Sequence, residues 1–180
     1  MKKFFWSALE ILETIVISFL AVFIIRTFLF QPFLVSGASM EPNFSSGDYL
    51  LVDEISYRFR EPQRGEVVVF EPPLGGSFFI KRIIGLPDEK IVIQNGEIII
   101  FDRQGNKMAL KEDYLPANIK TFGDLEVTLK SDQYFVLGDN RNFSFDSRSW
   151  GALSGEKIVG FARVRIWPIT AAMAFGTPAY

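Results

Sequence analysis

One serine in this 180-residue sequence has neighbours that suit a nucleophile. Ser39 follows Gly37 and Ala38, whose small size would let a second backbone approach its hydroxyl, and Pro42 prevents a preceding strand from continuing. A serine hydroxyl needs a neighbouring base. The sequence contains no histidine and no cysteine, which excludes a Ser-His-Asp triad and a cysteine protease. The base would be a lysine, a carboxylate or an amino terminus, unless the segment is simply a Gly/Ser/Pro turn.

A lysine within apolar sequence is the candidate base. Lys81 stands at the end of an expected strand, between Phe79-Ile80 and Arg82-Ile83-Ile84. Apolar neighbours would desolvate the amine and lower its pKa, which makes a lysine usable as a base near neutral pH. In an alternating strand, however, one of Lys81 and Arg82 would face solvent, and a lone lysine of that kind has no catalytic role.

A third polar segment follows directly after another expected strand. Residues 138–141 read Gly-Asp-Asn-Arg, and residues 143–151 contain Phe143, Phe145 and Trp150 among polar side chains. The polar groups could position catalytic residues. A solvated loop would account for the charges, but the aromatic side chains favour burial.

The element that precedes these segments is apolar. Residues 15–25 are apolar apart from one serine, and the apolar residues on either side extend this run to the ~20 residues that span a bilayer. Lys2 and Lys3 favour a cytoplasmic N-terminus. We therefore expect a cytoplasmic stub and transmembrane anchor over residues 1–31, and an extracytoplasmic domain over residues 32–180.

Two other interpretations of the N-terminus remain open. A buried core helix would show more amphipathic alternation than this run does. A cleavable signal peptide would use Lys2 and Lys3 as its basic region and Ser36-Gly37-Ala38 as a small-x-small cleavage site, which would make Ser39 the new N-terminus. We favour an uncleaved anchor, because the apolar run ends well before Ala38.

From residue 45 onward the sequence has the pattern of short strands and turns. Residues 91–93 and 98–101 flank Asn95-Gly96, which predicts a β-hairpin. Residues 163–166 alternate polar and apolar side chains, as a half-buried antiparallel strand should. Further strands are expected at residues 49–53, 67–70, 78–80, 127–129, 134–137 and 158–166.

The fold class predicted by these patterns is mainly β. No useful helical periodicity follows residue 40, and residues 108–122 have the pattern of a loop. We expect an N-terminal transmembrane helix followed by an antiparallel β-sheet domain, with a sandwich or barrel-like arrangement of sheets. A net charge of −2 does not suggest nucleic acid as a partner. Without cysteine or histidine, disulfides are excluded, and neither a metal site nor a cofactor is expected.

In this order and spacing, the three segments resemble bacterial type I signal peptidases, the membrane-bound Ser-Lys endopeptidases that remove signal peptides from exported preproteins. Residues 36–42 are similar to the nucleophile segment of that family, residues 80–87 to its general-base segment, and residues 138–151 to its third segment. Residues 26–33 resemble the junction between anchor and catalytic domain. The resemblance extends from the anchor to about Pro168.

The resemblance implies that Ser39 is the nucleophile and Lys81 its general base, with Ser144 as the serine that orients the lysine amine. It also implies an ion pair between Arg82 and Asp139 that fixes the lysine strand against the third segment. Asp146 and Arg148 would order that segment around the site.

The resemblance also implies how a substrate would bind. The family often has a serine where this chain has Gly37, so the backbone N–H of Ser39 and other donors would stabilise the oxyanion. Substrates would be extended, with small residues at the first and third positions before the cut, and would add as a strand beside those that precede Ser39 and Lys81. The expected contacts are Val35, Met40, Phe78 and Ile80.

The implied location is the bacterial cytoplasmic membrane, with a single span and the catalytic domain outside. The expected partners are preprotein signal peptides, the lipid bilayer and the secretion translocon. Two alternatives remain open: a Ser-Lys maturation peptidase dedicated to conjugation or pilus proteins, and an inactive membrane-tethered β domain that only binds extended peptides.

Overall fold

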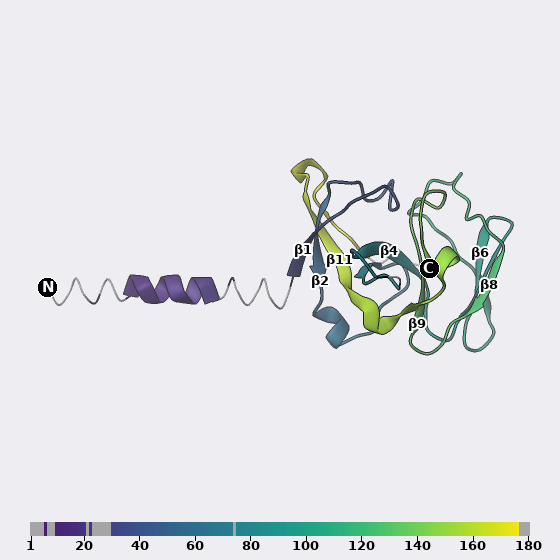
Figure 1. Ribbon diagram of the computed structural model, residues 1–180, viewed down its shortest axis with the longest axis horizontal. Coiled ribbons are helices and arrows are strands. Elements are labelled where there is room, and N and C mark those ends of the chain that lie inside the picture. The colour runs from purple at the N-terminus through teal and green to yellow at the C-terminus, as the bar shows by residue number, and fades with distance from the viewer. Residues whose placement is uncertain (1–5, 7–9, 21, 23–29, 74, 177–180) are drawn as a thin grey trace.

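The computed structural model describes residues 6, 10–20, 22, 30–73 and 75–176, and its β-strands confirm a mainly β protein with antiparallel sheets (Figure 1). The larger sheet has eight strands in the described part of the chain. Seven of them follow the order β1 (Phe30–Leu34), β2 (Tyr49–Asp53), β11 (Ile158–Trp167), β3 (Val67–Phe70), β4 (Phe79–Gly85), β9 (Gln133–Leu137) and β10 (Leu153–Ser154), and β12 (Met173–Ala174) pairs with β11.

The smaller sheet has four strands in the order β7 (Lys107–Ala109), β6 (Glu97–Phe101), β5 (Lys90–Gln94) and β8 (Leu125–Thr128). β5 and β6 form the expected hairpin, because Asn95 (φ 55°) and Gly96 (φ 85°) both adopt the positive φ that a two-residue turn of type I′ requires. Short helical turns complete the domain: α2 (Ser147–Trp150), η1 (Ser56–Arg58), η2 (Gly155–Lys157) and η3 (Ile169–Ala171). The sequence patterns had not indicated β7, β10 or β12.

The predicted transmembrane anchor lies in large part outside the residues that the structure describes. Residues 10–20 are helical with exposed side chains. No helix within the described residues combines the length and the apolar composition needed to cross a bilayer. The transmembrane part of the predicted fold is therefore not shown by the structure.

Three apolar clusters hold the domain together. One joins the two sheets, because Ile84 and Phe135 of the larger sheet pack against Ile91 and Ile100 of the smaller one. The second, around Val68, Phe70, Ile83 and Val136, lies within the larger sheet. The third places Met40 and Phe44, from the segment after β1, against Leu50 and Val67. These clusters fix the positions of β4, β9 and the residues that follow β1.

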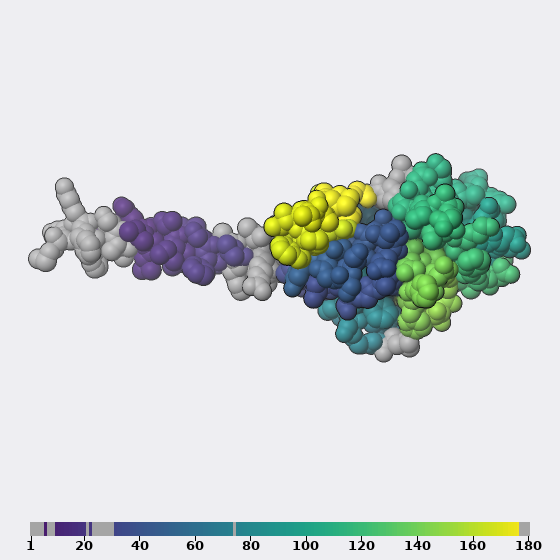
Figure 2. All heavy atoms as spheres, turned by 90° about the horizontal axis from the view of Figure 1, so that it is seen from above, coloured from purple at the N-terminus to yellow at the C-terminus, as the bar shows by residue number. Residues whose placement is uncertain are grey.

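The C-terminal end of the domain closes over the third cluster. The ring of Phe175 lies 4.5 Å from that of Phe44, centroid to centroid. Figure 2 shows this end of the chain, in yellow, lying beside the blue segment between β1 and β2.

The burial pattern that the alternation of residues 163–166 predicted is wrong. Arg165 is buried, whereas Ile166 is 40% exposed. The register of β11 against β2 shifts between Ala162 and Val164 and again between Arg165 and Trp167, and each irregularity reverses which side chain faces inward.

Candidate active site

Ser39 lies in the turn that follows β1, and the residues after it anchor that turn in the core. Met40 and Phe44 are each 1% exposed, and the backbone N–H of Phe44 donates to the carbonyl of Met40 at 2.9 Å. On the other side of the turn, the N–H of Val35 donates to the carbonyl of Asp48 at 2.8 Å. Ser39, between these anchors, is half-buried and faces the groove described below.

Lys81 approaches Ser39 from β4. Its amine donates hydrogen bonds to the Ser39 hydroxyl and to the Ile80 carbonyl, each at 2.8 Å. Lys81 is 4% exposed and Arg82 is 6% exposed, so neither side chain faces solvent. β4 is buried continuously from Lys81 to Gly85, because it is an inner strand covered on both faces.

The surroundings of Lys81 favour its neutral form. Burial lowers the pKa of the Lys81 amine to about 8, and the carboxylates of Asp146 and Asp139 oppose this shift. The Phe79 ring, whose centroid lies 5.4 Å from the amine, attracts the charged form and so acts in the same direction as these carboxylates. A lysine with this pKa is partly deprotonated near neutral pH and can accept the proton of a serine hydroxyl.

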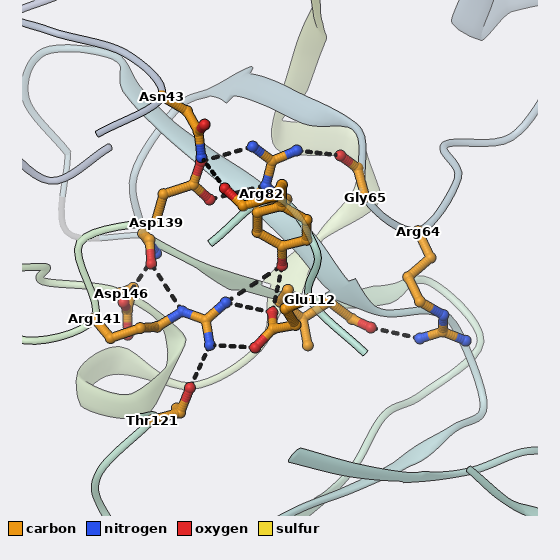
Figure 3. Close-up of polar contacts among 12 residues, drawn as sticks. Asn43, Arg64, Gly65, Arg82, Glu112, Thr121, Asp139, Arg141 and Asp146 are labelled. Atoms are coloured by element: carbon orange, nitrogen blue, oxygen red, sulfur yellow. Dashed lines mark hydrogen bonds and ion pairs between the residues drawn. The ribbon is translucent and has the colours of Figure 1, made fainter. Parts of the chain in front are cut away.

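A buried ion pair fixes β4 against the third segment (Figure 3). Arg82 donates to both carboxylate oxygens of Asp139, at 2.8 and 2.6 Å, and also to the carbonyl of Gly65 at 2.8 Å. The Asn43 side chain donates to Asp139 at 2.8 Å and to the carbonyl of Tyr114 at 3.0 Å. The Tyr114 ring lies under the Arg82 guanidinium, 4.0 Å from its centre. Five separate segments of the chain meet at this pair.

Sequence reasoning had missed a second buried cation next to this pair. Arg141 is 3% exposed and donates to the Glu112 carboxylate, the Thr121 hydroxyl and the Gly138 carbonyl (Figure 3). Glu112 and Thr121 belong to the segment expected to be a loop, which is β-strand only at its start, in β7. No pattern in that segment indicated that it would contact the site.

Asp146 orders the third segment from within. It is fully buried, accepts a hydrogen bond from the Gly138 N–H at 3.0 Å, and caps the first turn of α2. Arg148 donates to both oxygens of Asp146 at 2.9 Å, and to the Arg141 carbonyl at 2.7 Å. The segment therefore folds around one carboxylate.

Asn140 joins this segment to the turn that carries Ser39. Its backbone N–H donates to the Ser39 carbonyl, and its side-chain amide donates to the Ala38 carbonyl, both at 3.0 Å. The sequence placed Asn140 in the third segment without a role, since local pattern does not reveal a partner about a hundred residues away.

Ser144 lies near the Ser39 carbonyl, across Gly138. Its hydroxyl is buried and has no hydrogen-bond partner within the described part of the chain. A Cβ on Gly138 would collide with both the Ser144 hydroxyl and the Ser39 carbonyl, so glycine lets these groups come together. The orienting role of Ser144 stays a prediction.

The donors available to an oxyanion are backbone groups. Within the described residues, the N–H of Ser39 has no intramolecular acceptor. Gly37 adopts a φ of +92°, and its N–H makes a long contact of 3.4 Å to the Ser46 hydroxyl. The Ser39 N–H is thus free to bind an oxygen at the nucleophile.

A groove of about 500 Å³ is lined by both Ser39 and Lys81. One wall is the segment from Phe33 to Ser39, and the other comprises residues 77–81. The Phe33 and Phe78 rings meet edge to face at 5.6 Å, and so connect the two walls. Of the expected substrate contacts, Val35, Phe78 and Ile80 line the groove, whereas Met40 lies in the core beneath it.

The wall formed by β4 has an unpaired backbone edge. β4 pairs with β3 from Phe79 to Arg82, but its pairing with β9 begins only at Arg82. Among the described residues, no strand pairs with the edge of residues 79–81 that continues the line of β9, although the Ile80 carbonyl accepts a bond from the Lys81 amine, so an extended chain could bind there.

Known proteins resemble this chain over most of its length. The family described as "Signal peptidase, peptidase S26" matches residues 8–167. A probable signal peptidase I-2 of Synechocystis sp. is 40% identical, in a match that covers 89% of this chain and 74% of that protein. A signal peptidase I of Leptolyngbya laminosa is 36% identical, in a match that covers 94% of this chain and 85% of the relative. The solved structure of a signal peptidase I from Enterococcus faecalis is 30% identical, with a TM-score of 0.48 over 57% of this chain and 97% of that one.

Proposed function

The chain belongs to the signal peptidase family, peptidase S26, and is a serine endopeptidase of the signal peptidase I type; we propose that Ser39 and Lys81 carry out its reaction as a Ser-Lys pair. The observation that supports this most directly is the 2.8 Å contact between the buried Lys81 amine and the Ser39 hydroxyl. The substrates are preproteins that carry signal peptides.

In the proposed reaction, the neutral Lys81 amine accepts the proton of Ser39 as the serine oxygen attacks the carbonyl carbon of the scissile bond. The Ser39 N–H binds the oxyanion that forms. The Lys81 ammonium then gives its proton to the leaving amine, and the signal peptide remains as an ester on Ser39. A water molecule, deprotonated by Lys81, hydrolyses that ester and restores both groups.

The residues around Ser39 and Lys81 hold the two side chains in position. Arg82 and Asp139 hold β4 against the third segment, Asn140 holds the nucleophile turn against the same segment, and Asp146 with Arg148 orders it. Ser144, whose hydroxyl lies next to Gly138, is proposed to orient the Lys81 amine as the reaction proceeds.

The groove suits an extended substrate with small side chains before the cut. The residues before the cut would pair with the free edge of residues 79–81 and with the segment that leads to Ser39. In an extended chain the first and third residues before the cut point to the same side. Val35, Phe78 and Ile80 would then leave room for small side chains at both positions.

We further propose that residues 1–31 form a cytoplasmic stub and a single anchor in the bacterial cytoplasmic membrane, with residues 32–180 outside, near the bilayer and the translocon. The apolar run and Lys2 with Lys3 support this topology. Protease added to intact spheroplasts should digest the domain and leave the extreme N-terminus. N-terminal sequencing that starts at Ser39 would instead show a cleaved signal peptide.

A serine-directed acylating probe tests the nucleophile. The probe should label the purified full-length protein and the Ser36→Ala variant, because Ser36 lines the groove while the Lys81 amine bonds to Ser39. It should not label Ser39→Ala, and Lys81→Met should react far more slowly. Undiminished labelling of Ser39→Ala would contradict the assignment.

A further inference from the structure

Two phenylalanines of the third segment are exposed where the sequence favoured their burial. Phe143 is 78% exposed and Phe145 is 51% exposed, and both line the groove that contains Ser39 and Lys81. Large apolar side chains that stay exposed together beside a functional groove indicate a binding surface. The reaction mechanism proposed above does not use either ring.

The backbone that carries these rings is held firmly. The N–H of Phe143 donates to the Asn140 carbonyl at 3.0 Å, and Asn140 is itself bonded to the nucleophile turn. On the other side of Phe145, Asp146 is fully buried and bonded to the Gly138 N–H. The rings are therefore presented to the groove by a segment anchored at both ends.

The topology places the third segment at the catalytic end of the groove. Leu137 of β9 pairs with Arg82 of β4, so Gly138 begins the third segment beside Lys81, and a Cβ on Gly138 would touch the Ser39 carbonyl. A substrate bound to the free edge of residues 79–81 would lie in line with β9. The part of the substrate at the scissile bond must then meet the segment that follows β9.

This geometry separates the two sides of the scissile bond. The residues before the cut lie along the two walls that lead to Ser39 and Lys81. The residues after the cut must leave the groove past this pair, where the segment from Gly138 to Phe145 lies.

We propose that Phe143 and Phe145 form an apolar binding surface for the residues that follow the cut, the first residues of the mature protein. It follows that the enzyme favours apolar over charged side chains at the first two positions after the cut. This inference rests on the proposed function, since it concerns the same groove and the same reaction.

Peptides that differ only after the cut provide the test. Two fluorogenic peptides share their residues before the cut, and carry Leu-Phe or Ser-Asp after it. With the full-length enzyme in detergent micelles, kcat/KM should favour the Leu-Phe peptide by about tenfold, the scale on which apolar pockets discriminate. The Phe143→Ser/Phe145→Ser variant should lose most of that preference, mainly through a lower kcat/KM for the Leu-Phe peptide. The matched control is Phe59→Ser, since Phe59 is 83% exposed but does not line the groove, and it should keep the preference.

Several results would overturn the inference. One is equal kcat/KM for the two peptides with the wild-type enzyme, and another is an unchanged preference in the double variant. An equal loss for both peptides would mean that the rings support the fold of the third segment instead. Unchanged peptide preference together with weaker binding to anionic phospholipid vesicles would assign the rings to lipid contact. If the wild-type enzyme cleaves neither peptide, the proposed function itself fails.

Discussion

The Lys81 amine donates a hydrogen bond to the Ser39 hydroxyl at 2.8 Å, although 42 residues separate them in the sequence. Ser39 follows β1 and Lys81 lies on β4, and three strands stand between β1 and β4 in the sheet order. The sheet must curl for these two strands to form opposite walls of one groove. The contact between Ser39 and Lys81 therefore depends on the curvature of the whole sheet.

The first prediction concerns the pH dependence of the reaction. Lys81 accepts a proton only when neutral, and burial lowers its pKa to about 8. The kcat/KM should therefore rise about tenfold per pH unit below pH 8 and level off above it. Lys81→Arg should be inactive, because a guanidinium stays protonated. A rising limb that persists in Lys81→Met would contradict the assignment of Lys81 as the base.

The second prediction concerns stability. The pKa of Lys81 falls from its ordinary value of 10.5 to about 8 on folding, so between these pH values the unfolded chain binds more protons and stability rises with pH. Below pH 8 the buried ammonium costs at most about 3 kcal/mol. Lys81→Met removes this cost but also the bonds to Ser39 and Ile80, so it should raise the unfolding free energy at pH 7 by about 1 to 2 kcal/mol. Denaturant unfolding across this pH window should show a flatter profile for Lys81→Met than for wild type, whereas the exposed control Lys107→Met should leave the profile unchanged.

The third prediction concerns the buried ion pair. Asp139→Ala removes the carboxylate from a buried Arg82 and should destabilise the fold by roughly 3–5 kcal/mol. Activity should fall less than in Lys81→Ala, because no reacting group is lost. Asp113→Ala is the surface control: Asp113 pairs with Lys111 where both side chains are at least 74% exposed, and the loss should stay below about 1 kcal/mol. Equal melting temperatures for Asp139→Ala and wild type would show that the pair does not stabilise the fold.

The fourth prediction concerns Asn140. Asn140→Ala removes the side-chain bond to the Ala38 carbonyl and loosens the turn that carries Ser39. Single-turnover acylation should slow by about tenfold, with little change in KM, since misplacement of a reacting group acts on kcat. Asn142→Ala, two positions away and exposed, should acylate at the wild-type rate. A wild-type acylation rate in Asn140→Ala would show that the backbone hydrogen bond from Asn140 to the Ser39 carbonyl is enough to hold the turn in place.

The fifth prediction concerns Ser144. Its buried hydroxyl has no partner in the described part of the chain, so Ser144→Ala should leave the melting temperature near that of wild type. The kcat should fall, but less than in Lys81→Ala, if Ser144 orients the amine during the reaction. An unchanged kcat would exclude that role.

The pairing of Lys81 with Ser39 could be expected from the sequence because it depends on residue types. The absence of histidine left Lys81, set in apolar sequence, as the candidate base for Ser39, and the order of the three segments indicated the family. The hairpin at Asn95-Gly96 was equally predictable, since only these two residues decide its turn.

The tertiary structure decided which side chains are buried and which distant groups meet. Alternation suggested solvent exposure for Lys81 or Arg82, but an inner strand is covered on both faces, so both are buried. Irregular pairing of β11 turned Arg165 inward, and no local pattern reports such a shift. Phe143 and Phe145 are large and apolar, as core residues usually are. They are nevertheless exposed, because the segment that carries them is anchored beside the groove. Residue type sets what a group can do, whereas long-range register and layering set what it touches.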